Sequence, residues 1–291
     1  MDLSRLKIAK PDIFKLFDKM PTKVFRRSQI EEIITQNREF WRLSTATTVN
    51  RFIAFLIQEN KLKEIRFKFP TRSEIRYTWC DTPLYEVVLT IKPNSYFTHY
   101  TAMFFHQLTE QIPKIIYLNQ EQQQKRNREA HLTQSSIDLA FKRPVRVSNN
   151  IALCGEYKIC LLNGMYTGRL GVIETMGLGG EKIYVTDVER TLIDITVRPT
   201  YSGGIFEVLN AFRLARNKVS VNKLSAILQK LNYIYPYHQA VGFYLDRAGN
   251  YKDSSISLFR KFGMNYDFYL THQMKDMVYS KEWKLFYPKG L

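Results

Sequence analysis

The stretch LKEIRFKFPTRSEIRYTW, residues 62–79, alternates apolar and polar side chains on both sides of a short turn. Apolar side chains occupy every second position in residues 65–69 and again in residues 75–79, and Pro70 opens the segment between them. Because successive side chains of a strand point to opposite faces, this pattern predicts a two-stranded hairpin. Its inner face would be apolar and its outer face largely basic.

Three short helices are predicted before this hairpin. Residues 11–20 carry apolar side chains at helical spacing and are followed by Pro21. Ser28 and Glu31 have the spacing of a capping box at the start of a second helix. A third helix is predicted over residues 44–60. Its apolar face would gather Ala46, Val49, Phe52, Ile53, Leu56 and Ile57. Three helices followed by a basic hairpin is the order of a winged helix-turn-helix domain.

The polar face of the third helix and the outer face of the hairpin predict a DNA contact. In such a domain the third helix enters the major groove and the hairpin, or wing, lies along the backbone. Short hydroxyl side chains let a helix N-terminus approach a phosphate or a base edge. The predicted DNA-contact residues are Ser44, Thr47, Thr48, Arg51, Arg66, Lys68, Arg72 and Arg76, with Arg26, Arg27 and Arg42 as secondary candidates. The alternative is a winged helix used for protein contacts, which has no need of so basic a wing.

The charge of the chain favours an anionic partner. Its 291 residues include 43 Lys and Arg against 27 Asp and Glu, a formal net charge of +16. Residues 1–80 hold 17 Lys and Arg against 9 Asp and Glu, so half of the net charge lies in about a quarter of the chain. Nucleic acid or an anionic membrane surface suits such a charge, and a solvated basic surface is the alternative reading.

The sequence predicts two domains. Residues 81–83 (DTP) interrupt the hairpin pattern, so we place a winged helix-turn-helix domain in residues 1–82 and a larger mixed α/β domain in residues 83–291. The expected fold class is therefore α/β (α+β). In the second domain, strands are predicted at 85–91, 114–118, 137–141, 145–147, 157–162, 171–175 and 181–185. Helices are predicted at 98–108, 204–216, 220–232, 238–247 and 254–262, and the polar residues 120–128 are predicted to form a surface loop or strand extension.

Composition argues against several other classes. Cys80, Cys154 and Cys160 lack CxxC spacing, so neither a disulfide framework nor a zinc site is expected and a reducing cytoplasm is the default. No apolar run approaches the roughly 20 residues of a membrane span, and no apolar stretch follows the first charges as in a signal peptide. We expect no metal, no cofactor and no membrane partner.

A magnesium-dependent restriction-type nuclease is the main enzymatic alternative. Such sites need an Asp and an acid-x-Lys on adjacent strands, so that two carboxylates hold Mg²⁺. Asp138 followed by Glu156 and Lys158 has this form on predicted strands, although acid-x-Lys recurs by chance in so charged a chain. His99 and His106 lie two helical turns apart without an acidic partner at metal spacing. We therefore predict that the chain is not an enzyme and has no catalytic residues; a protein-binding adaptor is a third alternative.

Three segments resemble a known family. TDVERTLIDITVRP (186–199), SGGIFEVLNAF (202–212) and AVGFYLD (240–246) are similar to segments of the AbiEi-type antitoxins of type IV toxin–antitoxin systems. The segment YFTHYTAMFFHQLTEQIPKIIYL (96–118) looks like the start of the C-terminal domain of that family. Residues 120–150 and those after about 250 do not align with it.

The resemblance implies a DNA-binding autorepressor, two copies of which pair on an inverted-repeat operator. The sequence shows no coiled coil that would hold a dimer, so we expect a monomer in solution. The resemblance also implies a C-terminal domain with antitoxin action against a nucleotidyltransferase-like toxin, without a stable complex between the two. Within its first segment, Glu189 is interpreted as a helix cap. Arg190 and Asp194 are interpreted as an i,i+4 pair, worth a few tenths of a kcal/mol if exposed. We interpret the signature as a marker of the fold and not as a catalytic set.

Overall fold

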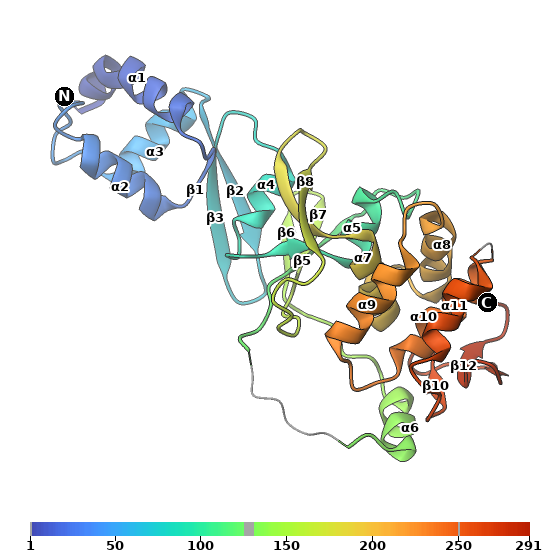
Figure 1. Ribbon diagram of the computed structural model, residues 1–291. Helices are drawn as coiled ribbons and strands as arrows, with labels where there is room; N and C mark the ends of the chain where they lie inside the picture. Colours follow the sequence, from blue (N-terminus) through green and yellow to red (C-terminus); the bar gives the residue numbers. More distant parts are fainter. Residues whose placement is uncertain (1, 125–130, 250) are drawn as a thin grey trace. The chain divides into compact units, whose positions relative to one another are not determined.

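The computed structural model describes residues 2–124, 131–249 and 251–291, and the fold is of the predicted mixed α/β class (Figure 1). The chain forms two compact units. Unit 1 comprises Met1–Pro93, Ile151–Tyr157 and Met176–Lys182, and unit 2 comprises Asn94–Asn150, Lys158–Thr175 and Ile183–Leu291. The predicted cut after residue 82 therefore falls inside unit 1. Unit 1 also includes two short segments that are distant in sequence, which no single cut could describe.

Unit 1 has the predicted order of three helices and a hairpin. Its elements are α1 (Asp2–Lys19), β1 (Val24–Phe25), α2 (Arg27–Asn37), α3 (Val49–Gln58), β2 (Leu62–Lys68), β3 (Ser73–Trp79), α4 (Leu84–Leu89) and β6 (Ile151–Cys154). Strands β2 and β3 pair antiparallel from Leu62 opposite Trp79 to Lys68 opposite Ser73. Strand β1 pairs with β3, and β6 pairs with β2 at Lys68. Strand β3 is therefore an interior strand, with a neighbour on each edge.

The core of unit 1 joins the inner face of the hairpin to the helices. The ring of Phe17, on α1, stacks on Trp79 of β3 with centroids 4.8 Å apart. Trp41 stacks on Phe52 of α3 at 5.7 Å. The indole N–H of Trp79 donates to Asp18 at 2.7 Å, which satisfies its polar atom within the apolar cluster. The register pairs Trp79, Tyr77 and Ile75 with Leu62, Glu64 and Arg66 on this face. Ile65 and Phe67 lie on the opposite face, opposite Arg76 and Glu74, so the prediction of a single apolar inner face is wrong.

Unit 1 differs from the prediction at four places. Helix α1 begins at Asp2 and not at residue 11, with Pro11 inside it. Helix α3 begins at Val49 and not at residue 44, because the Thr48 side chain accepts from the Arg51 N–H and caps the helix there. Helix α2 begins at Arg27, where the side chain of Gln29 accepts from the Arg26 N–H; the predicted Ser28–Glu31 box is not used. Residues 85–91, predicted as a strand, lie mostly in helix α4.

Unit 2 combines a mixed sheet with a group of helices. Its strands are β4 (Tyr96–Phe97), β5 (Ile115–Asn119), β7 (Tyr157–Leu162), β8 (Val172–Met176) and β9 (Lys182–Thr186), in the order β7-β5-β4-β9-β8. Strand β5 runs parallel to β7 and antiparallel to β4, and β4 runs parallel to β9. A separate three-stranded sheet contains β10 (Phe268–Tyr269), β11 (Met277–Ser280) and β12 (Leu285–Pro288), with β12 in the middle.

The helices of unit 2 carry the three segments that resemble the antitoxin family. They are α5 (His99–Phe105), α6 (Gln134–Lys142), α7 (Val188–Val197), α8 (Ile205–Ala215), α9 (Val221–Leu231), α10 (Tyr237–Ala248) and α11 (Asp253–Arg260), with a 3-10 turn at Pro199–Tyr201. In α7 every residue from Glu189 to Thr196 is buried. In α10 the ring of Trp283 lies against Gly242, where a Cβ would come within 2.1 Å of it. Gly242 is therefore required by close packing.

In unit 2, two segments predicted as strands have another structure. Residues 137–141, predicted as a strand, belong to helix α6, whose Thr133 cap accepts from the Ser136 N–H at 3.3 Å. Residues 145–147 lie in no strand. The polar segment 120–128 lies partly outside the described residues.

None of the helices in the described parts of the chain is both long and apolar enough to cross a membrane.

Candidate nucleic-acid interface and a polar cavity

The hairpin of unit 1 exposes three of its four predicted basic contacts. Arg66 pairs with Glu64 at 2.8 Å, and Arg72 pairs with Glu74 at 3.1 Å while its guanidinium lies 4.2 Å from the centre of the Phe69 ring. Lys68 is also exposed. Exposed ion pairs contribute about 0–1 kcal/mol each, so both arginines can exchange a glutamate for a phosphate at small cost.

Arg76, the fourth hairpin residue, is only 4% exposed. Its guanidinium donates to the carbonyl of Thr90 at 2.9 Å and to the Thr90 hydroxyl at 3.1 Å, and pairs with Glu74 at 3.2 Å. Burial, together with the nearby Arg26, lowers the pKa of Arg76, although Glu74 partly offsets this. Alternation predicts this side chain on a basic outer face, whereas the register places it on the face that carries Ile65 and Phe67. The prediction of an exposed contact is wrong here because the segment after α4 covers that face.

The N-terminal end of α3 exposes part of the predicted groove face. Thr48 and Arg51 are exposed, and Ser44 is half-buried in the turn that precedes the helix. Thr47 is fully buried, and its carbonyl accepts from Arg38 at 3.2 Å. Because this turn is not helical, Thr47 points into unit 1 and not to the outer face. The secondary candidates Arg26, Arg27 and Arg42 are exposed.

The nuclease arrangement loses one of its two strands. Asp138 lies on helix α6, where its carboxylate accepts from Gln134 at 2.9 Å and from the Tyr269 hydroxyl at 3.0 Å. Glu156 is exposed in the turn between β6 and β7. Within the described residues, no three His, Cys, Asp or Glu side chains are grouped so that they could hold a metal ion.

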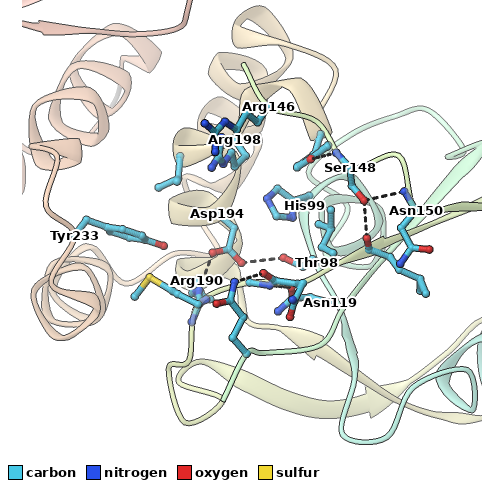
Figure 2. Close-up of a pocket in the computed structure, with 18 residues that line it drawn as sticks. Thr98, His99, Asn119, Arg146, Ser148, Asn150, Arg190, Asp194, Arg198 and Tyr233 are labelled. Atoms are coloured by element: carbon cyan, nitrogen blue, oxygen red, sulfur yellow. Dashed lines mark hydrogen bonds and ion pairs between the residues drawn. The ribbon is translucent and has the colours of Figure 1, made fainter. Parts of the chain in front are cut away.

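Unit 2 contains a polar cavity of about 550 Å³ beside α7 (Figure 2). At its base, Arg190 pairs with Asp194 at 2.7 Å, and their side chains are 6% and 8% exposed. The second carboxylate oxygen of Asp194 accepts from the Thr98 hydroxyl at 2.9 Å, and Arg190 also donates to the carbonyl of Leu170 at 2.8 Å. Burial alone would lower the pKa of Arg190, but Asp194 and two nearby tyrosines raise it above its ordinary value.

This geometry corrects the interpretation of the ERTLID signature. The Arg190–Asp194 pair is buried, so the few tenths of a kcal/mol expected of an exposed pair do not apply to it. The cap of α7 is Asp187, which accepts from the Arg190 N–H at 2.7 Å. Glu189 instead accepts from the Ser220 N–H at 2.8 Å and pairs with Lys223 at 2.9 Å, which ties α7 to the start of α9.

His99 lies in the wall of the cavity, between Asp194 and the Ser148–Asn150 segment in Figure 2. It is the first residue of α5, with a φ of +52°, and its Nδ1 is buried without a hydrogen-bond partner among the described residues. Burial lowers the pKa of His99 to about 4, against the opposing effect of Asp194. The ring is therefore neutral at physiological pH. His106 has a separate role, because its Nε2 donates to the carbonyl of Thr186 at 2.5 Å.

No sequence pattern pointed to the other cavity residues. Arg146 and Arg198 lie at one end of the cavity in Figure 2, and Tyr233 lies at its side. Burial raises the pKa of Tyr233, so that its hydroxyl stays protonated. One sequence signal was present in α7, where the charged i,i+4 pair Arg190 and Asp194 lies among mostly apolar residues. A charged pair in so apolar a helix indicates that the pair is buried.

Comparison with known proteins supports the fold alone. No family model matches the chain, and neither does any curated protein. Among solved structures, the chain is similar to the RV2827C protein from Mycobacterium tuberculosis, with a TM-score of 0.62 at 12% sequence identity. The match covers 96% of this chain and 91% of that protein. The fold is therefore similar over nearly the whole length of both chains.

Proposed function

We propose that this protein is a DNA-binding transcriptional repressor of its own operon and the antitoxin of a type IV toxin–antitoxin pair. The observation that carries the DNA-binding part is the exposed basic hairpin β2–β3, which follows three helices whose third begins at an exposed cap. This order is that of a winged helix-turn-helix domain.

In this proposal α3 enters the major groove by its N-terminal end. Arg51 is long enough to reach a base edge, and Thr48 and Ser44 hydrogen-bond to phosphates or bases beside it. Arg66, Lys68 and Arg72 place the hairpin along the backbone as a wing. Thr47 and Arg76 act from inside unit 1, where they hold the turn and the β3–α4 packing, and do not touch DNA.

The antitoxin part rests on the family resemblance of three segments, which lie along α7, α8 and α10. We propose that two copies, each a monomer in solution, pair on an inverted-repeat operator in double-stranded DNA. The functional partner is a nucleotidyltransferase-like toxin that is countered without a stable complex. The protein acts in the cytoplasm, without a cofactor, and is not an enzyme.

A titration of the full chain against its own upstream region tests this proposal. A scrambled duplex of the same length is the control, and the titration is repeated across salt concentrations with Mg²⁺ present. We expect tighter binding to the upstream region, with an affinity that falls steeply as salt rises because phosphate contacts release counterions. Equal binding to both duplexes, or no binding at low salt, would contradict the repressor. Cleaved DNA would favour the nuclease alternative.

A further inference from the structure

Two arginines in the wall of the cavity have no ionic partner within the described chain. The side chains of Arg146 and Arg198 make no hydrogen bond or ion pair with any described residue, and both are exposed at their outer surface. Asp194, the one carboxylate among the described residues that line the cavity, is occupied by Arg190 and Thr98. A pair of like charges at one place is unfavourable unless an anion balances it.

The side chains that line the cavity carry a net charge of +2. Arg190 is neutralised by Asp194, and His99 is uncharged at physiological pH, so Arg146 and Arg198 supply the excess. A phosphate monoester carries about −1.5 to −2 at pH 7 and offers three acceptor oxygens. The planar fork of a guanidinium binds such a group with two parallel hydrogen bonds, and two arginines match one phosphate in charge.

The rest of the wall offers uncharged hydrogen-bonding groups. The Asn150 amide, the Tyr233 hydroxyl and the His99 ring all line the cavity, and none of them forms a side-chain hydrogen bond with another described residue. Neutral groups of this kind suit the hydroxyl groups of a sugar better than a second charge. A volume of about 550 Å³ lies within the usual range for small-molecule sites and is too small for a DNA duplex.

A second cavity of about 270 Å³ continues from the same two arginines. Arg146 and Arg198 line it as well, and its other walls include the aromatic side chains of Phe141, Tyr235 and Tyr237. A ligand whose phosphate sits between the two cavities could therefore extend into either one, with aromatic surface on this second side.

We propose that unit 2 binds a small organic phosphate, whose phosphate group is held by Arg146 and Arg198 and whose hydroxyl groups lie against Asn150, Tyr233 and His99. The site does not depend on the DNA-binding proposal, because every residue in it belongs to unit 2. Sugar phosphates and nucleoside monophosphates share this chemistry, and they differ in whether a base is present to use the second cavity.

Calorimetric titration of the full chain at pH 7.5 tests the site with four probes: ribose 5-phosphate, adenosine 5′-monophosphate, ribose and inorganic phosphate. We expect both phosphate esters to bind and ribose to show no binding. Tighter binding of the nucleotide would show that the base uses the second cavity, and equal binding would identify the sugar phosphate as sufficient. Absence of binding by both esters, or inorganic phosphate binding as tightly as they do, would overturn the proposal.

Arginine variants localise the site. Arg146→Ala and Arg198→Ala should each weaken ester binding about tenfold or more, since each removes charge-assisted hydrogen bonds. Both side chains lack partners in the described structure, so the variants should melt at the same temperature as the parent. Arg146→Lys should bind at an intermediate strength, because it keeps the charge and loses the fork. Arg213→Ala, an exposed arginine of α8 that lines neither cavity, is the matched control. Equal loss in Arg213→Ala, or unchanged affinity in both cavity variants, would overturn the assignment.

Discussion

The arginines of the two units differ in their ionic partners. In unit 1 the exposed Arg66 and Arg72 each pair with a glutamate of the same hairpin. In unit 2 Arg190 is buried with Asp194, whereas Arg146 and Arg198 line a cavity without a carboxylate to spare. An open surface with weak pairs suits a long polyanion, which displaces several of them at once. A cavity wall with two unpaired cations suits a small anion. The two proposals therefore rest on different arrangements of arginine.

The largest expected effect contrasts the buried pair with an exposed one. Asp194→Asn removes the charge that balances Arg190 and should lower the free energy of unfolding by about 3–5 kcal/mol, because an uncompensated buried charge remains. Glu64→Gln, which breaks the exposed pair with Arg66, should change it by less than about 1 kcal/mol. Urea unfolding of the full chain measures both. Similar losses in the two variants would contradict the contrast.

Acid should weaken unit 2 through His99. The folded-state pKa of about 4 lies below the ordinary value of 6.5, so the unfolded chain takes up a proton that the folded chain does not. Above pH 6.5 the ring is neutral in both the folded and the unfolded chain, so it does not affect the free energy of unfolding. As pH falls from 6.5 to 4, the free energy of unfolding decreases by up to about 3 kcal/mol. Asn tolerates a positive φ, which makes His99→Asn a suitable variant without this titration. Its unfolding free energy should fall less steeply over that interval; parallel curves for parent and variant would refute the role of His99.

Close packing in α10 gives the next effect. Gly242→Ala places a methyl group where the ring of Trp283 lies, so the ring or the helix must shift. We expect a loss of about 1–3 kcal/mol in the free energy of unfolding, as is usual when a packed core is overfilled. Ala248→Gly, at the end of the same helix, controls for helix propensity. A Gly242→Ala variant as stable as the parent would show that the packing is looser than described.

The smallest effects separate groove from wing in unit 1. Arg51→Ala should weaken binding to the operator by about 1–3 kcal/mol and leave scrambled DNA nearly unaffected. Lys68→Ala should weaken all duplexes alike and reduce the salt slope by about one unit. Lys15→Ala, an exposed lysine of α1, controls for the loss of one positive charge. An equal loss of affinity for both duplexes in Arg51→Ala would contradict the placement of α3 in the major groove.

Sequence patterns predicted unit 1 well where its structure is local. Alternation over residues 62–79 and the apolar face of α3 depend on neighbours in sequence. Both the hairpin and the helix could therefore be predicted. Thr47 and Arg76 were misplaced because their burial depends on a non-helical turn and on the segment after α4. In α6, Ile137 and Phe141 are buried four residues apart, and so short an apolar run was misread as a strand.

The cavity of unit 2 could not be read from the sequence in the same way. Its lining brings together residues from 98 to 233, and Arg146 lies in a segment without regular structure. The Arg190–Asp194 spacing was visible, but its burial depends on the elements packed around α7. Local patterns thus predicted the basic hairpin, whereas the cavity required the tertiary fold.

Hydrogen exchange of the full chain, measured by mass spectrometry with operator DNA and separately with ribose 5-phosphate, tests the division of roles most directly. We predict that DNA slows exchange in residues 44–58 and 62–79 of unit 1, and that ribose 5-phosphate slows it in residues 96–105 and 144–150 and in α7 of unit 2. Protection of the α7 region by DNA in place of the hairpin would contradict the account.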